Sequence, residues 1–89
     1  PSEARVWNHL GLAYHGAGRE AEAEKAYLRA LERNRNYFDV WFNLGALKHG
    51  QGDWLETERS LRTYLGIEGN RTNAAAWRLL GLAQFEARQ

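Results

Sequence analysis

The sequence predicts an all-α protein made of antiparallel helical hairpins that stack on one another. Its 89 residues contain the pattern Trp-x-x-Leu-Gly three times, as WNHLG at Trp7, WFNLG at Trp41 and WRLLG at Trp77. The spacings between these tryptophans are 34 and 36 residues, which indicates one structural unit that occurs repeatedly. Alanine, glutamate and arginine are abundant and the only proline is Pro1, so the composition favours helices.

The first unit is expected to form two helices, one on each side of the segment GAGR at residues 16–19. The apolar stripe of the first helix consists of Ala4, Trp7, Gly11 and Tyr14. The stripe of the second helix consists of Ala23, Ala26, Tyr27, Ala30 and Leu31. The members of each stripe recur at the spacing that places them on one face of a helix.

The second unit repeats this layout, and the third unit supplies one further helix. The expected core residues are Trp41, Leu44, Gly45 and Leu47, then Leu61, Tyr64 and Leu65, and finally Trp77, Leu80 and Gly81. Gly52 is predicted to end one helix and Asp53 to cap the next. Thr72 and Asn73 are expected to open the last helix. The segment GIEGNRTN before it carries two extra residues, so this junction should be looser or locally reshaped.

The repeated residues are interpreted as packing residues. We expect the glycine of each pattern to let the two helices of a hairpin approach closely, opposite a small residue such as Ala23 or Thr57. Each tryptophan and leucine should fill the space between successive hairpins, because one hairpin alone cannot bury its apolar stripe. Trp54, in the turn, is also interpreted as packing. Lys48 occupies the position of the aromatic Tyr14, and we hypothesise that Tyr64 restores the lost volume.

Size and composition exclude several function classes. A chain of 89 residues has no room for separate catalytic and binding lobes. Twelve basic and eleven acidic residues give a formal charge of +1, which provides no extended field for nucleic acid or an anionic membrane. Cysteine is absent, which excludes a disulfide scaffold and a thiolate metal site. No apolar run approaches the roughly 20 residues that span a bilayer, so we expect no membrane insertion.

No set of residues predicts catalysis or a cofactor. His15 and His49 occupy equivalent positions, so stacking could place them side by side, but two imidazoles without a third ligand make a poor zinc site. Ser60 has no histidine near it in the pattern, and Asp53 with Glu56 is typical of a helix cap. We therefore expect a protein that is not an enzyme and that binds no metal or cofactor.

These residues resemble the tetratricopeptide repeat, a helix-turn-helix of 34 residues with the signature W-x2-L-G-x2-Y, A-x3-F and P. Tyr27 and Leu61 stand in the phenylalanine position, and Arg35 and Gly69 replace the proline. The resemblance implies a short right-handed α-solenoid of five helices in a single domain, residues 1–89. The repeats would span about 4–37 and 38–73, with a half repeat at 74–89. Because the chain begins at Pro1 without a methionine, we interpret it as part of a longer protein.

In this family the first helices of successive repeats line a concave groove that holds a peptide or a partner helix. Carried onto this sequence, the groove residues are Arg5, Asn8, His9, Leu12, His15, Asp39, Phe42, Asn43, Ala46, His49, Arg78, Leu79 and Leu82. Asparagine can both donate to and accept from a peptide backbone. The resemblance therefore implies a scaffold that binds a protein or peptide. The alternative is self-association, in which the apolar faces of the terminal helices pack on further repeats or on a second copy.

One subset of the family uses a carboxylate clamp to hold the tails of heat-shock chaperones. The clamp needs Lys and Asn in the first helix, Asn in the third, and Lys and Arg in the fifth. Here only Asn43 matches, because Asn8, Leu12, Ala75 and Leu79 occupy the other positions. The sequence therefore predicts a protein outside this subset.

Overall fold

The computed structural model describes residues 2–89, and the side chains of residues 3–89, so Pro1 of the predicted domain lies outside the described residues. Over this range the chain forms five α-helices and one short 3-10 helix, with no β-strand. The elements are α1 (Ser2–Gly16), α2 (Glu20–Arg33), α3 (Asp39–Gly50), α4 (Trp54–Leu65), η1 (Glu68–Thr72) and α5 (Ala74–Ala87). The prediction of an all-α helical repeat is confirmed.

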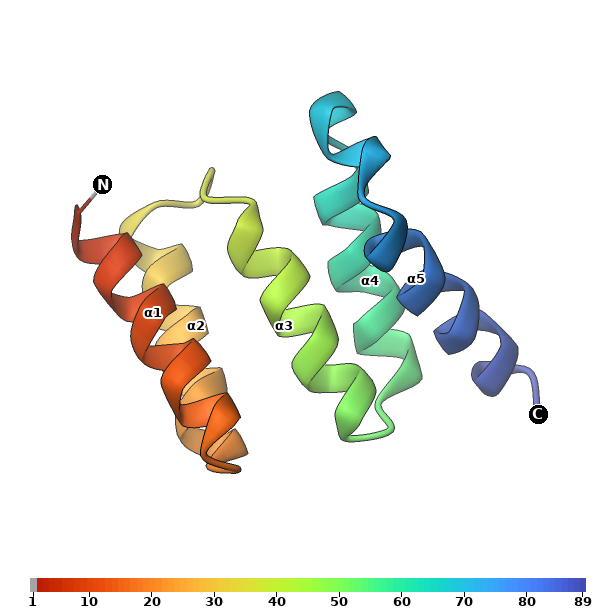
Figure 1. Ribbon diagram of the computed structural model, residues 1–89, viewed down its shortest axis with the longest axis horizontal. Helices are drawn as coiled ribbons and strands as arrows, with labels where there is room; N and C mark the ends of the chain where they lie inside the picture. The colour runs from red at the N-terminus through yellow and green to blue at the C-terminus, as the bar shows by residue number, and fades with distance from the viewer. Residues whose placement is uncertain (1) are drawn as a thin grey trace.

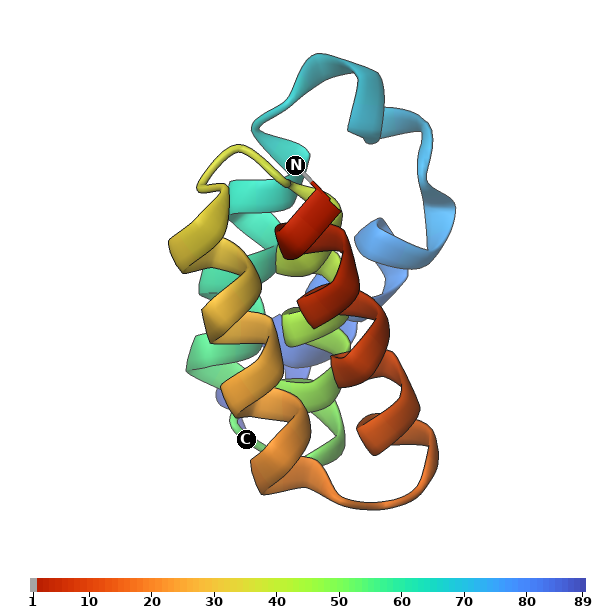
Figure 2. The same cartoon turned by 90° about the vertical axis from the view of Figure 1, so that its left-hand side faces the viewer.

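The helices form two layers (Figures 1 and 2). Helices α1 and α2 form one antiparallel hairpin, α3 and α4 form the next, and α5 packs against α4. The first helices α1, α3 and α5 lie along one side of the stack, while α2 and α4 lie along the other. This arrangement leaves one continuous face that is built only from first helices.

The two hairpin turns have the same backbone geometry. Gly18 and Gly52 have positive φ angles of 79° and 75°. In each turn the next residue donates its backbone N–H back to the end of the preceding helix, from Arg19 to the Tyr14 carbonyl and from Asp53 to the Lys48 carbonyl. This is the glycine-based helix ending that satisfies otherwise unpaired carbonyl groups. The predicted role of Gly52 is confirmed.

Two predicted helix caps are also present. The Asp53 carboxylate accepts the backbone N–H of Glu56 at 3.3 Å, and the Asn73 side-chain oxygen accepts that of Ala76 at 3.2 Å. Thr72 does not open α5, because it belongs to η1. Such caps satisfy N–H groups that lack a partner inside the helix.

Close approach within each hairpin depends on a glycine, as predicted, but the neighbouring residue differs from the prediction. A Cβ atom added to Gly11 would lie 2.5 Å from the ring of Tyr27, and one added to Gly45 would lie 3.0 Å from Leu61. The nearest side chains are therefore large residues rather than Ala23 and Thr57. At each of these two glycines the missing side chain leaves a hole, which a large buried side chain fills.

The core consists of two clusters that meet at one tryptophan. The first lies between the two hairpins and includes Tyr27, Leu44 and Leu47, and the second includes Leu61 and Leu80. Trp41 packs against both clusters, as expected for a residue between successive hairpins.

The packing prediction is wrong for Trp77, which is 49% exposed. The equivalent Trp7 and Trp41 lie beside the second helix of their own hairpin, and no described helix occupies that place beside α5. The indole of Trp77 instead donates to the Arg71 carbonyl at 2.8 Å.

The hypothesis that Tyr64 compensates for Lys48 is also wrong. The Tyr64 ring lies 5.4 Å from the ring of Phe42. Phe42 precedes Lys48 by six residues, which is about 9 Å along α3. The ammonium group of Lys48 instead donates to Glu24 of α2 at 3.0 Å, with its side chain only 15% exposed. Lys48 therefore joins the two hairpins through an ion pair.

The longer junction before α5 is reshaped into η1 and is tied down by hydrogen bonds. Asn70 donates to the Tyr64 carbonyl at 3.0 Å, and Arg71 donates to the Leu65 carbonyl at 3.1 Å. These carbonyls lie in the last turn of α4, where intrahelical partners are lacking. Asn73 also donates to the Tyr64 hydroxyl at 3.0 Å.

In the described residues, each helix is too short or too polar to cross a membrane.

Burial of Tyr27 leads to a prediction about alkaline stability. Its hydroxyl is buried without a hydrogen-bond partner among the described residues, and burial raises the pKa of the phenol above its usual value. The unfolded chain therefore loses this proton first, at about pH 10, and stability falls as the pH rises further. We expect Tyr27→Phe to reduce this loss without lowering stability at pH 7. Urea unfolding at pH 7 and above pH 10 measures both effects, and an equal alkaline loss in the two proteins contradicts the prediction.

Candidate functional site

The predicted groove residues all lie on α1, α3 and α5, the helices that form the face built from first helices. We call this surface the groove face and define it by the thirteen residues predicted above. The outward-facing members are Arg5, His9, Leu12, Asp39, Arg78 and Leu82. The partly exposed members are His15, Phe42, Asn43, Ala46, His49 and Leu79. The remaining member, Asn8, is buried.

Asn8 and Asn43 form a bridge between α1 and α3. The Asn43 side-chain nitrogen donates to the Asn8 side-chain oxygen at 2.9 Å, and Asn8 is only 4% exposed. A buried amide needs such a partner, because leaving it unpaired costs about 1–3 kcal/mol. Asn8 therefore fixes the relative position of two helices, while Asn43 remains accessible. Sequence reasoning placed both residues on this face but did not distinguish their environments.

Packing contacts hold three further groove residues in place. Phe42 packs against Tyr64 of α4, and Leu79 packs against the same core cluster. The ring of His49 meets Trp54 edge-on, with the ring centroids 5.3 Å apart. These side chains are partly ordered by the layer behind them, so binding a ligand would cost them little conformational freedom.

The groove face is chemically mixed. It presents the guanidinium groups of Arg5 and Arg78, one carboxylate at Asp39, and apolar side chains of which Leu12 is 43% and Leu82 45% exposed. The two leucines are on the outer helices of the face and the amide of Asn43 is on the middle helix. Such a surface can combine apolar contact with hydrogen bonds. Across residues 2–89, no three histidine, aspartate or glutamate side chains come together as a metal site requires.

A contact between α4 and α5 helps to hold α5, the third helix of the groove face. The Glu58 carboxylate accepts hydrogen bonds from Arg62 at 2.8 Å and from Gln84 of α5 at 3.5 Å. These hydrogen bonds, with that from Arg62 the largest cause, hold the pKa of Glu58 below its usual value.

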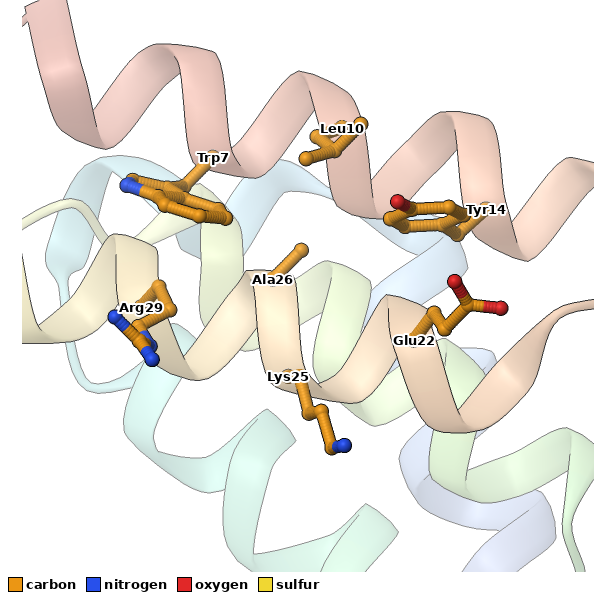
Figure 3. A pocket seen from close by; sticks show the side chains of 7 residues that line it. All are labelled: Trp7, Leu10, Tyr14, Glu22, Lys25, Ala26 and Arg29. Carbon is orange, nitrogen blue, oxygen red and sulfur yellow. The ribbon is translucent and has the colours of Figure 1, made fainter.

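A hollow lies on the outer side of the first hairpin, and sequence reasoning missed it. It has a volume of about 310 Å³ and is lined by Trp7, Leu10, Tyr14, Glu22, Lys25, Ala26 and Arg29. Figure 3 shows the three α1 side chains above α2, with Ala26 directed toward them and Lys25 turned away. The guanidinium of Arg29 lies 5.8 Å from the Trp7 ring, a distance typical of a cation–π contact. Comparing the three units in the sequence could not have found this hollow, because Leu10 has the same local pattern as the buried Leu44 and Leu80.

Another hollow, of about 680 Å³, lies on the side away from the groove face. Its walls come from α2, from the loop after it, and from α3 and α4. The lining residues are Leu28, Leu31, Glu32, Arg35, Phe38, Trp41 and Thr63.

Two family models, each described as tetratricopeptide repeat, match the chain at residues 4–37 and 26–59. The first matched range covers most of the α1/α2 hairpin, and the second runs from α2 to α4. Together they cover residues 4–59, which is more than half of the chain. No curated protein gives a significant match. The repeated tryptophan pattern, the stacked hairpins and these matches show that the chain belongs to the tetratricopeptide repeat family.

Proposed function

We propose that this chain is a non-enzymatic scaffold that binds a peptide or a partner helix on its groove face. Tetratricopeptide repeats generally mediate protein–protein interactions and form a scaffold fold that is not catalytic. The observation that carries the finer proposal is the exposure of Leu12 and Leu82 on the helices flanking the partly exposed Asn43. Apolar side chains around a small number of polar groups are typical of binding sites.

The Asn8–Asn43 bridge supports the same proposal. Asn43 uses its side-chain nitrogen to bind Asn8, which leaves its side-chain oxygen free to accept a backbone N–H from a ligand. Leu12 and Leu82 would then provide apolar contact on each side. This combination favours an extended segment with apolar side chains over a small polar metabolite.

The test uses a peptide selected for binding to the 89-residue chain from a random peptide library. We expect Leu12→Glu and Leu82→Glu each to weaken binding at least tenfold, because each replaces an apolar contact by a charge that must be desolvated. The matched control is Leu28→Glu, since Leu28 is 45% exposed on α2, away from the groove face. Titration by fluorescence anisotropy gives the dissociation constants. If Leu28→Glu weakens binding while the two groove variants do not, the ligand binds elsewhere and the proposal is wrong.

A further inference from the structure

The hollow between the two complete hairpins has apolar walls. It has a volume of about 680 Å³, and its apolar lining consists of Leu28 and Leu31 of α2, Phe38 just before α3, and Trp41 of α3. We call it the junction hollow. Its volume lies within the range of about 300–1,000 Å³ that is typical of ligand sites, so it has room for more than one side chain.

The junction hollow does not lie at an end of the helix stack. Both hairpins that form its walls are present, and α2 and α4 lie on the side of the stack opposite the groove face (Figures 1 and 2). In a stack of repeats, each repeat contacts only its neighbours. A repeat added before α1 or after α5 therefore extends the stack along its axis and does not cover this hollow.

The walls of the junction hollow are held in place without a ligand. Leu31 and Trp41 pack against the first core cluster. In the loop between them, the Asn34 carbonyl accepts the backbone N–H of Tyr37 at 3.2 Å. The Phe38 carbonyl accepts the backbone N–H of Trp41 at 2.9 Å. Because these walls are already ordered, binding costs them little conformational entropy.

The apolar lining is specific to this junction. At the next junction, between α4 and α5, the repeat spacings of 34 and 36 residues place Arg62 and Ala74 at the positions of Leu28 and Phe38. A large apolar residue is thus replaced by a charged one at the first position and by a small one at the second. The apolar hollow is therefore a feature of the first junction and not of the repeat pattern as such.

Trp41 also has an unused hydrogen-bond donor. The equivalent Trp77 donates its indole N–H to the Arg71 carbonyl at 2.8 Å. Over residues 3–89, the indole of Trp41 makes no such bond, and its N–H group is not fully buried. A ligand carbonyl can therefore accept a hydrogen bond from it.

The polar rim of the junction hollow carries one charge of each sign. It consists of Glu32, Arg35 and Thr63, all of which are exposed. In the part of the chain with described side chains, Glu32 and Arg35 form no ion pair with each other or with another residue. The two charges are therefore separate, and both are accessible to a ligand. Such rim charges determine the choice and the orientation of a partner more than the affinity.

We propose that the junction hollow binds a segment of a partner protein in which two apolar residues stand between an acidic and a basic residue. The apolar pair packs against Leu28 and Phe38, the acidic residue pairs with Arg35, and the basic residue pairs with Glu32. Because the two rim charges lie apart, they also determine the direction in which the segment binds. The groove face is on the opposite side of the stack, so the two sites can be occupied together.

The test is a nuclear magnetic resonance titration of the isotope-labelled 89-residue chain with three blocked tetrapeptides. They are acetyl-Asp-Leu-Leu-Lys-amide, its reverse acetyl-Lys-Leu-Leu-Asp-amide, and the uncharged acetyl-Ser-Leu-Leu-Ser-amide. We expect one order of the charged peptide to bind with a dissociation constant of about 1 mM. It should bind about fivefold more tightly than the uncharged peptide, as for two exposed ion pairs. The indole N–H signal of Trp41 should shift, while the amide signals of Leu12 and Asn43 on the groove face should not.

Two variants distinguish the junction hollow from the rest of the surface. Leu28→Glu places a charge on the apolar wall and should weaken binding at least fivefold. The matched control is Leu12→Glu on the groove face, since Leu12 is 43% and Leu28 45% exposed, and it should bind the peptide like the unmodified chain. Exchanging the rim charges by combining Glu32→Arg with Arg35→Glu should reverse the preference between the two peptide orders. A general loss of stability would instead weaken both orders equally.

Four results would overturn the proposal. The first is a Trp41 signal that does not shift with either charged peptide at about 10 mM, ten times the expected dissociation constant. The second is a charge-exchanged variant that keeps the original preference. The third is a shift of the groove-face signals alone, which would leave the function proposed for the groove face intact. The fourth is a Trp41 signal that moves on dilution without peptide, because the occupant would then be a second copy of the chain.

Discussion

Gly11→Ala should lower the free energy of unfolding by about 1–2 kcal/mol, because overpacking of the core costs about 2–3 kcal/mol here, the upper part of its range. The added methyl group would lie 2.5 Å from the ring of Tyr27, far inside van der Waals contact. Tyr27 is fully buried between the helices, so its ring cannot move aside without shifting other core residues. The helix propensity of alanine offsets only about 1 kcal/mol of this cost.

The matched controls are the other two glycines of the same pattern. Gly45→Ala should cost less, because the added atom would lie 3.0 Å from Leu61. Gly81→Ala should raise stability by about 0.5–1 kcal/mol, because it adds helix propensity and contacts nothing. Urea unfolding at micromolar concentration, followed by circular dichroism, gives all three values. If the three substitutions have equal effects, the glycines are not holes for buried side chains.

Tyr64→Ala should lower the free energy of unfolding by about 3–5 kcal/mol, as for other large aromatic residues that are removed from a core. Tyr64 is 6% exposed, packs in the second core cluster and lies 5.4 Å from the Phe42 ring. Its hydroxyl also accepts a hydrogen bond from Asn73, the residue that caps α5. Tyr64→Phe keeps the ring and loses only this bond, so it should cost about 1 kcal/mol.

Double-mutant cycles distinguish the contact of Tyr64 with Phe42 from the compensation for Lys48 that the sequence suggested. An aromatic pair contributes about 0.5–1.5 kcal/mol beyond burial, so Tyr64→Ala and Phe42→Ala should show a coupling energy of this size. Tyr64→Ala and Lys48→Ala should be additive within about 0.5 kcal/mol, because Tyr64 of α4 packs on Phe42 near the start of α3 whereas Lys48 lies near its end. A strong coupling to Lys48 together with additivity at Phe42 would contradict the structure.

The sequence predicts which positions lie on the candidate site, but not the burial or the contacts of the side chains there. The repeat period places Leu12, Asn43 and Leu82 on first helices, and the structure finds all three there. The period does not reveal that Asn8 is buried against Asn43, because a hydrogen bond over 35 residues depends on how two hairpins pack. It also does not reveal the hollow at Leu10. Leu10 has the same local sequence pattern as Leu44, and only the neighbouring helix makes one exposed and the other buried.

By itself the sequence determined the helical repeat, the glycine turn at Gly52, the caps at Asp53 and Asn73, and the family. Each of these depends on interactions between residues that are close along the chain or recur at a fixed period. The tertiary structure alone decided that Tyr27 fills the hole at Gly11, that Tyr64 packs on Phe42, and that Gly81 stays unfilled. These outcomes depend on which helix lies beside which, since burial is a property of the neighbours of a residue and not of its type.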